Sequence, residues 1–138
     1  THKLGTNYAG WLADAAAVTV RFCVDYNTYA YTDNPAAYVA QMNGLITGQL
    51  ATTLQTLFGT PGVAELRKSQ KQVSTGTAAI NSLRAFGPSS LTFLVTTSQR
   101  LVSAGRTSHA SAQYAVTVTG SGGSWQVNDI QLSNAGNI

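Results

Sequence analysis

Residues 109–119 read His-Ala-Ser-Ala-Gln-Tyr-Ala-Val-Thr-Val-Thr, and their apolar side chains recur at alternate positions. One parity holds Ala110, Ala112, Tyr114, Val116 and Val118, and the other holds His109, Ser111, Gln113, Thr117 and Thr119. A period of two predicts a strand with one face in the core and the other toward solvent. The stretch therefore predicts a sheet that is covered on one side only.

The residues before this stretch predict two further strands. Residues 91–101 alternate in the same way, between the turn sequence Gly-Pro-Ser-Ser at 87–90 and the break Ser-Ala-Gly at 103–105. Residues 72–85 are rich in Val, Thr and Ile, and we expect a β-bulge at Gly76.

A last strand follows the loop Gly-Ser-Gly-Gly at 120–123. Its apolar residues form two pairs of opposite parity, Trp125 with Val127 and Ile130 with Leu132. A bulge near Asn128-Asp129 would turn both pairs toward the core. We expect Trp125 and Val127 to pack beneath the first helix, against Val18 and Phe22.

The first half of the chain has helical periodicity instead. From about Gly10 to Tyr31, apolar residues recur in steps of three and four, at Trp11, Ala15, Val18, Phe22, Tyr26 and Tyr29. This spacing predicts one amphipathic helix. Asp33-Asn34-Pro35 predicts the start of a second helix, because an Asx cap followed by proline favours a first helical turn.

The second helical pattern continues to residue 58. Its apolar positions are Tyr38, Met42, Leu45, Ile46, Leu50, Leu54, Leu57 and Phe58. Gly44 and Gly48 weaken this pattern by up to about 1 kcal/mol each relative to alanine. Gly-Thr-Pro-Gly at 59–62 ends it, and we expect a short helical piece around Val63 to Lys68.

Helices followed by four long strands predict an α+β fold, with N-terminal helices packed on a curved, about four-stranded antiparallel sheet. We expect a single domain over residues 1–138, about 10–68 helical and about 71–134 in the sheet. A chain of 138 residues is near the modal size of one domain. The arrangement resembles the cone of the nuclear transport factor 2-like superfamily.

Charged residues make up only 9% of the chain, and the net charge of +3 comes from few side chains. Only Arg67, Lys68 and Lys71 cluster, which we interpret as a solvated helix end, with a phosphate- or lipid-binding role as the alternative. Nucleic-acid binders usually present a basic stripe interleaved with aromatic residues, and none is visible. We therefore expect no direct binding of nucleic acid.

Cys23 is the only cysteine, so no intrachain disulfide can form, and its apolar neighbours predict a buried, inert thiol. No apolar run reaches the roughly 18 residues of a membrane span, and no signal peptide is present. The sequence opens at Thr1 rather than Met, which is typical of a mature or excised fragment. The sequence leaves open whether a membrane anchor lies upstream of Thr1.

Few residues could carry chemistry. Enzymes of the same fold, such as ketosteroid isomerases and polyketide cyclases, place an Asp or His base in the cone beside an oxyanion donor. The candidates are Asp14, Asp25, Asp33, Asp129, His109, Tyr26, Tyr29, Tyr31 and Tyr38. Structural roles explain most of the acids: Asp33 as a helix cap, Asp25 as the partner of Arg21, and Asp129 as a bulge or turn residue.

The remaining candidates also have structural interpretations. Asp14 lies one position before the apolar stripe, His109 shares its strand face with polar residues, and the tyrosines lie at helical spacing typical of a core. Two histidines and one cysteine provide no metal-ligand spacing, and no phosphate-binding loop or nucleophile elbow occurs. We therefore expect no catalytic residue, no cofactor and no metal.

Several motifs resemble those of envelope proteins. Residues 15–22 resemble the first helix of this group, and residues 78–83, 87–95 and Gln99 resemble the central hairpin of actinobacterial Mce-associated proteins. Residues 114–118, 123–130 and 136–137 resemble the terminal hairpin of TcpC-like conjugation proteins. The TcpC-like proteins are relatives of the VirB-type scaffold of type IV secretion. Such proteins typically have a cytoplasmic tail, one transmembrane helix and an extracytoplasmic domain.

The resemblance implies a non-enzymatic scaffold domain of a conjugative, type IV secretion-like complex in a Gram-positive envelope. The domain would lie on the extracytoplasmic face, tethered by an upstream transmembrane helix, with other envelope proteins as partners and weak homo-oligomers. We expect the polar sheet face with Gln113, Thr117 and Thr119 to be the interaction surface.

Two alternatives stay open. One is a Mce-associated accessory protein of lipid import. The other is a small ligand-binding protein or isomerase-like enzyme with Asp14 or His109 in a deep cone. A cone filled by Phe22, Tyr26, Leu54 and Trp125 would argue against the enzyme.

Overall fold

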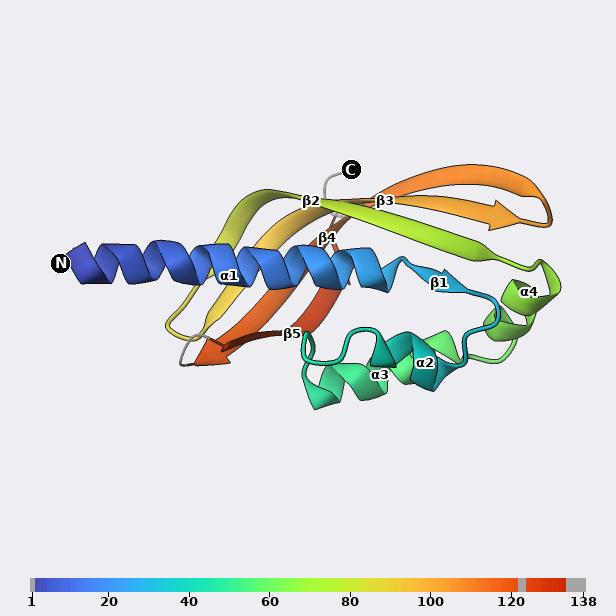
Figure 1. Ribbon diagram of the computed structural model, residues 1–138, viewed down its shortest axis with the longest axis horizontal. Coiled ribbons are helices and arrows are strands. Elements are labelled where there is room, and N and C mark those ends of the chain that lie inside the picture. Colours follow the sequence, from blue (N-terminus) through green and yellow to red (C-terminus); the bar gives the residue numbers. More distant parts are fainter. Residues whose placement is uncertain (1, 122–123, 134–138) are drawn as a thin grey trace.

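Five antiparallel strands form one sheet in the order β1-β2-β3-β4-β5, and four helices accompany it in the computed structural model (Figure 1). The structure describes residues 2–121 and 124–133, and side chains within 10–120 and 124–133. The elements are α1 (His2–Tyr26), β1 (Tyr29–Ala30), α2 (Pro35–Ala40), α3 (Gly48–Phe58), α4 (Val63–Ser69), β2 (Val73–Phe86), β3 (Ser90–Ser103), β4 (Arg106–Ser121) and β5 (Ser124–Leu132). The predicted α+β class is confirmed.

The long strands form where the sequence alternates. Along β3, Leu91, Phe93 and Val95 are buried, whereas the residues between them are only partly buried. The β3–β4 connection is the predicted break at 103–105: Ala104 and Gly105 have φ of 51° and 80°. Two consecutive residues with positive φ make a tight turn whose twist matches that of the strands.

The first helix differs from its prediction at both ends. It begins at His2 rather than about Gly10, and it ends at Tyr26 rather than Tyr31. Tyr29 and Ala30 instead pair with Ser74 and Val73 as the short edge strand β1, which makes the sheet five-stranded.

The buried face of α1 also differs slightly from the predicted one. Trp11 is 46% exposed, whereas Thr19 and Cys23 are fully buried. Thr19 can occupy the core because its hydroxyl donates to the carbonyl of Ala15 at 2.8 Å.

The predicted second helix is broken into two. Its cap is Asn34, whose Oδ1 accepts from the Ala37 amide at 2.7 Å. Asp33 is therefore not the helix cap: its Oδ2 accepts from the Ala30 amide at 2.9 Å and closes the turn after β1. The helix ends at Ala40, and Gly44 follows with φ of 85°.

The segment after Gly44 covers the outer edge of β5. Ile46 forms a parallel bridge with Val127, with the Val127 amide donating to Leu45 O at 2.7 Å and the Thr47 amide donating to Val127 O at 3.0 Å. Edge strands carry unpaired backbone groups, so this bridge satisfies part of that edge. It holds α2 and α3 against the C-terminal strand.

The bulge predicted near Asn128-Asp129 is confirmed. Pairing passes from Thr117 with Asp129 directly to Val118 with Val127, which leaves Asn128 as the extra residue. The bulge turns Ile130 toward the core, but Leu132 stays 56% exposed, so the second apolar pair is buried only in part.

The bulge predicted at Gly76 is wrong. Gly76 pairs regularly with Gln99, and the register shifts of β2 occur between Ile80 and Ser82 and between Leu83 and Ala85. Glycine is needed at this position because the chain at the end of α1 comes very close to it. A Cβ there would lie 2.7 Å from Asn27 Cβ and 2.9 Å from Val24 O. Only glycine lets the end of α1 lie against β2.

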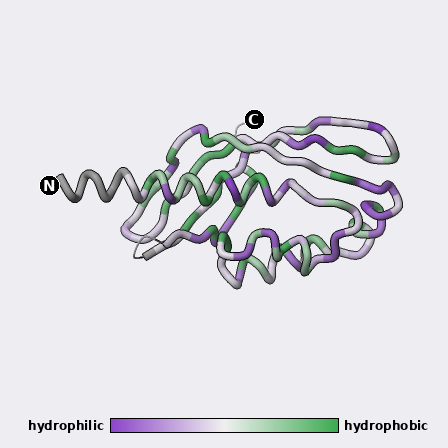
Figure 2. The backbone as a smooth tube through the Cα atoms, in the orientation of Figure 1, coloured by the Kyte–Doolittle hydropathy of each residue, from purple (hydrophilic) through white to green (hydrophobic). Residues whose placement is uncertain are grey.

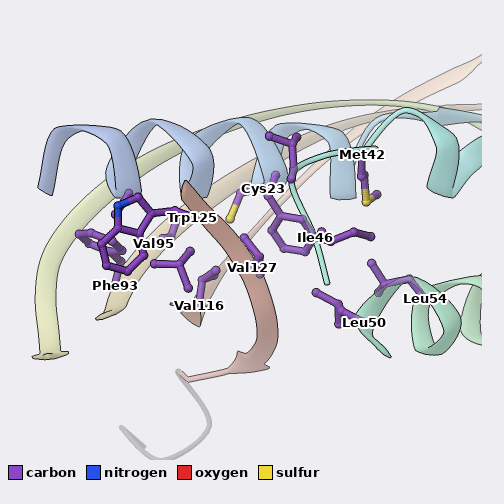
Figure 3. Packing of buried hydrophobic residues seen from close by; sticks show 14 of the residues in the cluster. Cys23, Met42, Ile46, Leu50, Leu54, Phe93, Val95, Val116, Trp125 and Val127 are labelled. Atoms are coloured by element: carbon purple, nitrogen blue, oxygen red, sulfur yellow. The ribbon is translucent and has the colours of Figure 1, made fainter. Parts of the chain in front are cut away.

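The core lies between α1, α3 and the inner face of the sheet (Figure 3). Trp125 and Val127 are buried there together with Phe22, and Val18 packs against the same cluster, as predicted. Figure 2 shows hydrophobic and hydrophilic stretches interspersed along the strands. Gly122 and Gly123 of the predicted hairpin loop, and the motif residues Gly136 and Asn137, lie outside the described residues.

Candidate functional site

The sheet has two chemically different faces. Its inner face carries Leu91, Phe93, Val95, Val116 and Val118 and is covered by helices. The opposite face carries mainly Thr, Ser, Gln and Ala, and no helix among residues 2–121 and 124–133 packs on it. We call this opposite side the polar sheet face.

The three predicted interface residues lie on the polar sheet face of β4. Gln113 is paired with Thr96, Thr117 with Thr92 and Thr119 with Ser90, and all three are partly buried. The Thr117 hydroxyl lies 2.9 Å from the Thr92 hydroxyl. Cross-strand hydroxyl pairs of this kind hold the side chains in fixed positions.

The structure does not bring Asp14 or His109 together with the candidate oxyanion donors. His109 is exposed on the polar sheet face opposite Arg100, whereas Tyr26, Tyr29 and Tyr38 lie on the helical side. Asp14 is exposed on α1, twelve residues before Tyr26, a rise of about 18 Å along a helix. No base–donor pair of the kind that an isomerase needs is formed by these residues.

The other acidic candidates have structural surroundings. Asp129 lies beside the β5 bulge, opposite Thr117. Burial raises the pKa of Asp25, and the nearby Arg21 guanidinium lowers it in part. Arg21 therefore acts on Asp25 electrostatically, but the predicted ion pair between them is not formed in the described part of the chain. Tyr31 is partly buried in the turn after β1.

The four side chains expected in the cone belong to the hydrophobic core or pack against it, and two of them, Tyr26 and Leu54, also line a pocket. Phe22, Leu54 and Trp125 are buried, and the Tyr26 ring packs against Phe22 and Tyr114 with centroids 5.7 Å apart in each case. Cys23 lies in the same core, where burial raises the pKa of its thiol to about 12, so the thiol is inert as predicted.

One site was missed by sequence reasoning. Beyond the end of α1, a pocket of about 290 Å³ lies between the helices and the sheet, with lining residues from all four helices and from β1, β3 and β4. Tyr29, Tyr38 and Phe58 form its aromatic wall, and Tyr38 stacks on Phe58 with centroids 4.1 Å apart. The Tyr38 hydroxyl donates to Tyr26 O at 2.6 Å.

Arg67 also lines this pocket and is only 6% exposed, so the interpretation of Arg67, Lys68 and Lys71 as a fully solvated cluster is wrong. Its Nη2 donates to Phe58 O at 2.9 Å, and its guanidinium carbon lies 3.7 Å from the centre of the Phe58 ring. The sequence contains no sign of this, because Arg67 is turned inward by the packing of α4 on α3.

Two further searches concern the described residues alone. Within residues 2–121 and 124–133, no group of three or more His, Cys, Asp or Glu side chains could hold a metal ion. No helix in this part of the chain is both long enough and apolar enough to cross a membrane.

Comparison with known proteins finds similarity in structure but not in sequence. No protein-family model matches the chain, and no curated protein matches it in sequence. An IcmL-like type IV secretion system protein from Legionella pneumophila superposes with a TM-score of 0.71 at 11% identity, covering 88% of this chain and 91% of that one.

Two further solved structures are similar. CagV, a VirB8 homologue of the Helicobacter pylori type IV secretion system, gives a TM-score of 0.64 at 10% identity, covering 88% of this chain and 97% of that one. A periplasmic fragment of TraM gives 0.58 at 8% identity, covering 86% and 94%. The chain therefore has the fold of these domains, and the fold implied by the sequence resemblance is confirmed.

Proposed function

We propose that this chain is a scaffold domain of a cell-envelope, type IV secretion-like complex that transfers DNA by conjugation. The observation that carries the proposal is the shared fold, which extends over most of this chain and of each secretion protein it resembles. Fold similarity alone does not imply function, so the chemistry of the surfaces must support it too.

The surface chemistry favours association over catalysis. Asp14 and His109 lie apart from the tyrosine hydroxyls, and Phe22, Leu54 and Trp125 are buried in the core. The polar sheet face offers Gln113, Thr117 and Thr119 for contact with partners. Such a face meets another protein with little desolvation of charge, so binding is modest in isolation and strengthened by tethering.

The proposal places the domain on the extracytoplasmic face of the membrane, tethered through an upstream transmembrane helix. Its partners are other envelope proteins of the same complex, and the isolated domain is a monomer or a weak oligomer. Tethering in one membrane raises the effective concentration of the partners, which lets a weak interface operate.

Photo-crosslinking from the polar sheet face tests the proposal. A photoreactive amino acid replaces Thr117 in the full-length protein in its native host, and the matched control replaces Thr53, which is exposed on α3. We expect position 117, but not position 53, to crosslink to another protein of the secretion apparatus, identified by mass spectrometry. Equal crosslinking from both positions, or none from 117, would contradict the assigned surface.

A further inference from the structure

The pocket beyond the end of α1 contains an arginine without a counter-ion. Arg67 is 6% exposed, and its Nε has no hydrogen-bond acceptor among the described residues. The bond from Nη2 to Phe58 O at 2.9 Å places the charge at the C-terminal end of α3, where the helix dipole favours a cation. That contact uses one donor of a group that has five.

No carboxylate of the chain compensates Arg67. All five acidic residues lie in the described part of the structure, and none forms an ion pair with Arg67 there. The acid closest in sequence, Glu65, accepts from the Gly62 amide at 2.7 Å instead. Buried charges are normally paired, so an unpaired buried guanidinium favours an anion from outside the chain.

The neighbouring polar groups are hydrogen-bond donors as well. Gln99 Nε2 donates to Tyr29 Oη at 3.3 Å and to Ser74 Oγ at 2.8 Å, which leaves the Tyr29 hydroxyl proton available to an acceptor. Tyr26 and Tyr114 also line the pocket, and burial raises the pKa of both hydroxyls. They stay protonated at neutral pH and can donate.

Apart from Asn27, the rest of the pocket lining is apolar. Tyr38 and Phe58 stack face to face, and Tyr29 meets Phe58 edge-on with centroids 5.6 Å apart. At the rim, Leu57 is 58% exposed and Val63 is 56% exposed. The pocket is open to solvent, and its volume of about 290 Å³ is at the small end of the range for ligand pockets, which fits one ring or a branched aliphatic group.

We propose that this pocket binds a carboxylate borne on an aromatic or branched apolar group. The carboxylate faces Arg67 and the Tyr29 hydroxyl, and the apolar group lies against Phe58 and Leu57. Two sources present this chemistry: a free organic acid, and the C-terminal residue of a partner protein. The site lies on the helical side of the sheet, away from Gln113, so it is independent of the polar sheet face.

Matched probes test the proposal and separate the two sources. Phenylacetate, N-acetyl-phenylalanine and N-acetyl-phenylalaninamide are titrated into the isotope-labelled protein, and the amide shifts of Tyr29 and Arg67 are followed by NMR. We expect the acid N-acetyl-phenylalanine to bind about tenfold or more tightly than its neutral amide, because a charge-assisted contact is lost in the amide. Binding of phenylacetate alone identifies a free organic acid, and binding of N-acetyl-phenylalanine identifies a chain terminus. Failure of both acids, or equal binding of acid and amide, overturns the proposal.

Two exposed leucines provide matched variants that leave Arg67 in place. Leu57→Glu sets a carboxylate at the rim, where it competes for Arg67, whereas Leu66→Glu makes the same change at a residue that is 53% exposed and outside the pocket. We expect Leu57→Glu to weaken the bound acid about tenfold or more, and Leu66→Glu to leave it within about twofold. Equal effects of the two substitutions would overturn the assignment of the pocket.

Discussion

Trp125 fixes the C-terminal strand to the core. Its ring lies beneath α1 near Phe93 and Val95, and 9% of the residue is exposed (Figure 3). Gly120 is the cross-strand neighbour, and a Cβ there would lie 2.8 Å from atoms of the indole ring. The buried Nε1 has no acceptor among the described residues, so the ring stabilises the fold through packing rather than hydrogen bonding.

Truncation of this ring should therefore be costly. We expect Trp125→Ala to lower the free energy of unfolding by about 3–5 kcal/mol. Trp125→Phe should cost less, because it keeps most of the apolar contact and loses no hydrogen bond. Urea denaturation of the three proteins measures both values. An unchanged midpoint for Trp125→Ala would mean that the ring lies on the surface.

Gly76 should tolerate no side chain. Alanine there would place a Cβ 2.7 Å from Asn27 Cβ, so we expect Gly76→Ala to destabilise the fold by about 1–3 kcal/mol. Gly87→Ala is the control, because its Cβ would meet nothing closer than Ser90 Oγ at 3.7 Å. Thermal melts compare the two, and similar midpoints would contradict the close approach of α1 to β2.

At the scale of elements, the hydrophobic periodicity of the sequence predicts those helices and strands that depend on local sequence. The alternation in residues 91–101 and 109–119 predicts β3 and β4, and the opposite parity of Trp125 and Ile130 predicts the bulge. The two-residue strand β1 and the bridge at Ile46 could not be predicted, because their partners are more than forty residues away in the chain. Long-range pairing overrides the helical pattern at both places.

The candidate site was predictable only in part. Alternation places Gln113 and Thr117 on the polar face of β4, and their role as an interface stays a prediction. The pocket around Arg67 is lined by residues from seven separate elements, and no local sequence pattern predicts how these elements meet. A buried arginine and an exposed one look the same in a sequence of this kind.

The helices α1 and α2 should make the fold sensitive to alkaline pH. Burial raises the pKa of Cys23 on α1 to about 12 and also raises the pKa of Tyr38 on α2, mainly through desolvation. Both groups lose their protons more readily in the unfolded chain. Their stabilisation is complete below the unfolded pKa values of about 8.5 and 10 and decreases as the pH rises above them.

Urea denaturation between pH 7 and 11 measures this decrease. We expect the free energy of unfolding to fall above about pH 8.5, by up to about 1.4 kcal/mol per pH unit for each group. Cys23→Ala should remove the part of the decrease that begins below pH 10. A stability that is flat up to pH 11 would contradict the burial of these groups.

At the scale of the whole molecule, the two faces of the sheet serve different purposes. The inner side is filled by the core and ends in the pocket around Arg67. The polar sheet face lies on the side opposite to α1 and is the surface that we propose for assembly. In Figure 1 the N-terminus lies at one end of the molecule and α4 at the other, so a tether at the N-terminus leaves α4 and the pocket distant from it.

The central claim is that this chain acts by association through its polar sheet face. The most direct measurement is the frequency of DNA transfer in a native host that lacks the gene and carries full-length variants. We expect Gln113→Arg and Thr117→Arg to lower transfer about tenfold or more, with melting temperatures close to that of the parent, because a buried unpaired charge weakens an interface.

Thr53→Arg on α3 is the control for added charge, and Asp14→Ala and His109→Ala are the controls for catalysis. All three should support normal transfer. If Asp14→Ala or His109→Ala abolishes transfer while both arginine variants of the polar sheet face leave it intact, the scaffold account is wrong and an enzymatic one takes its place.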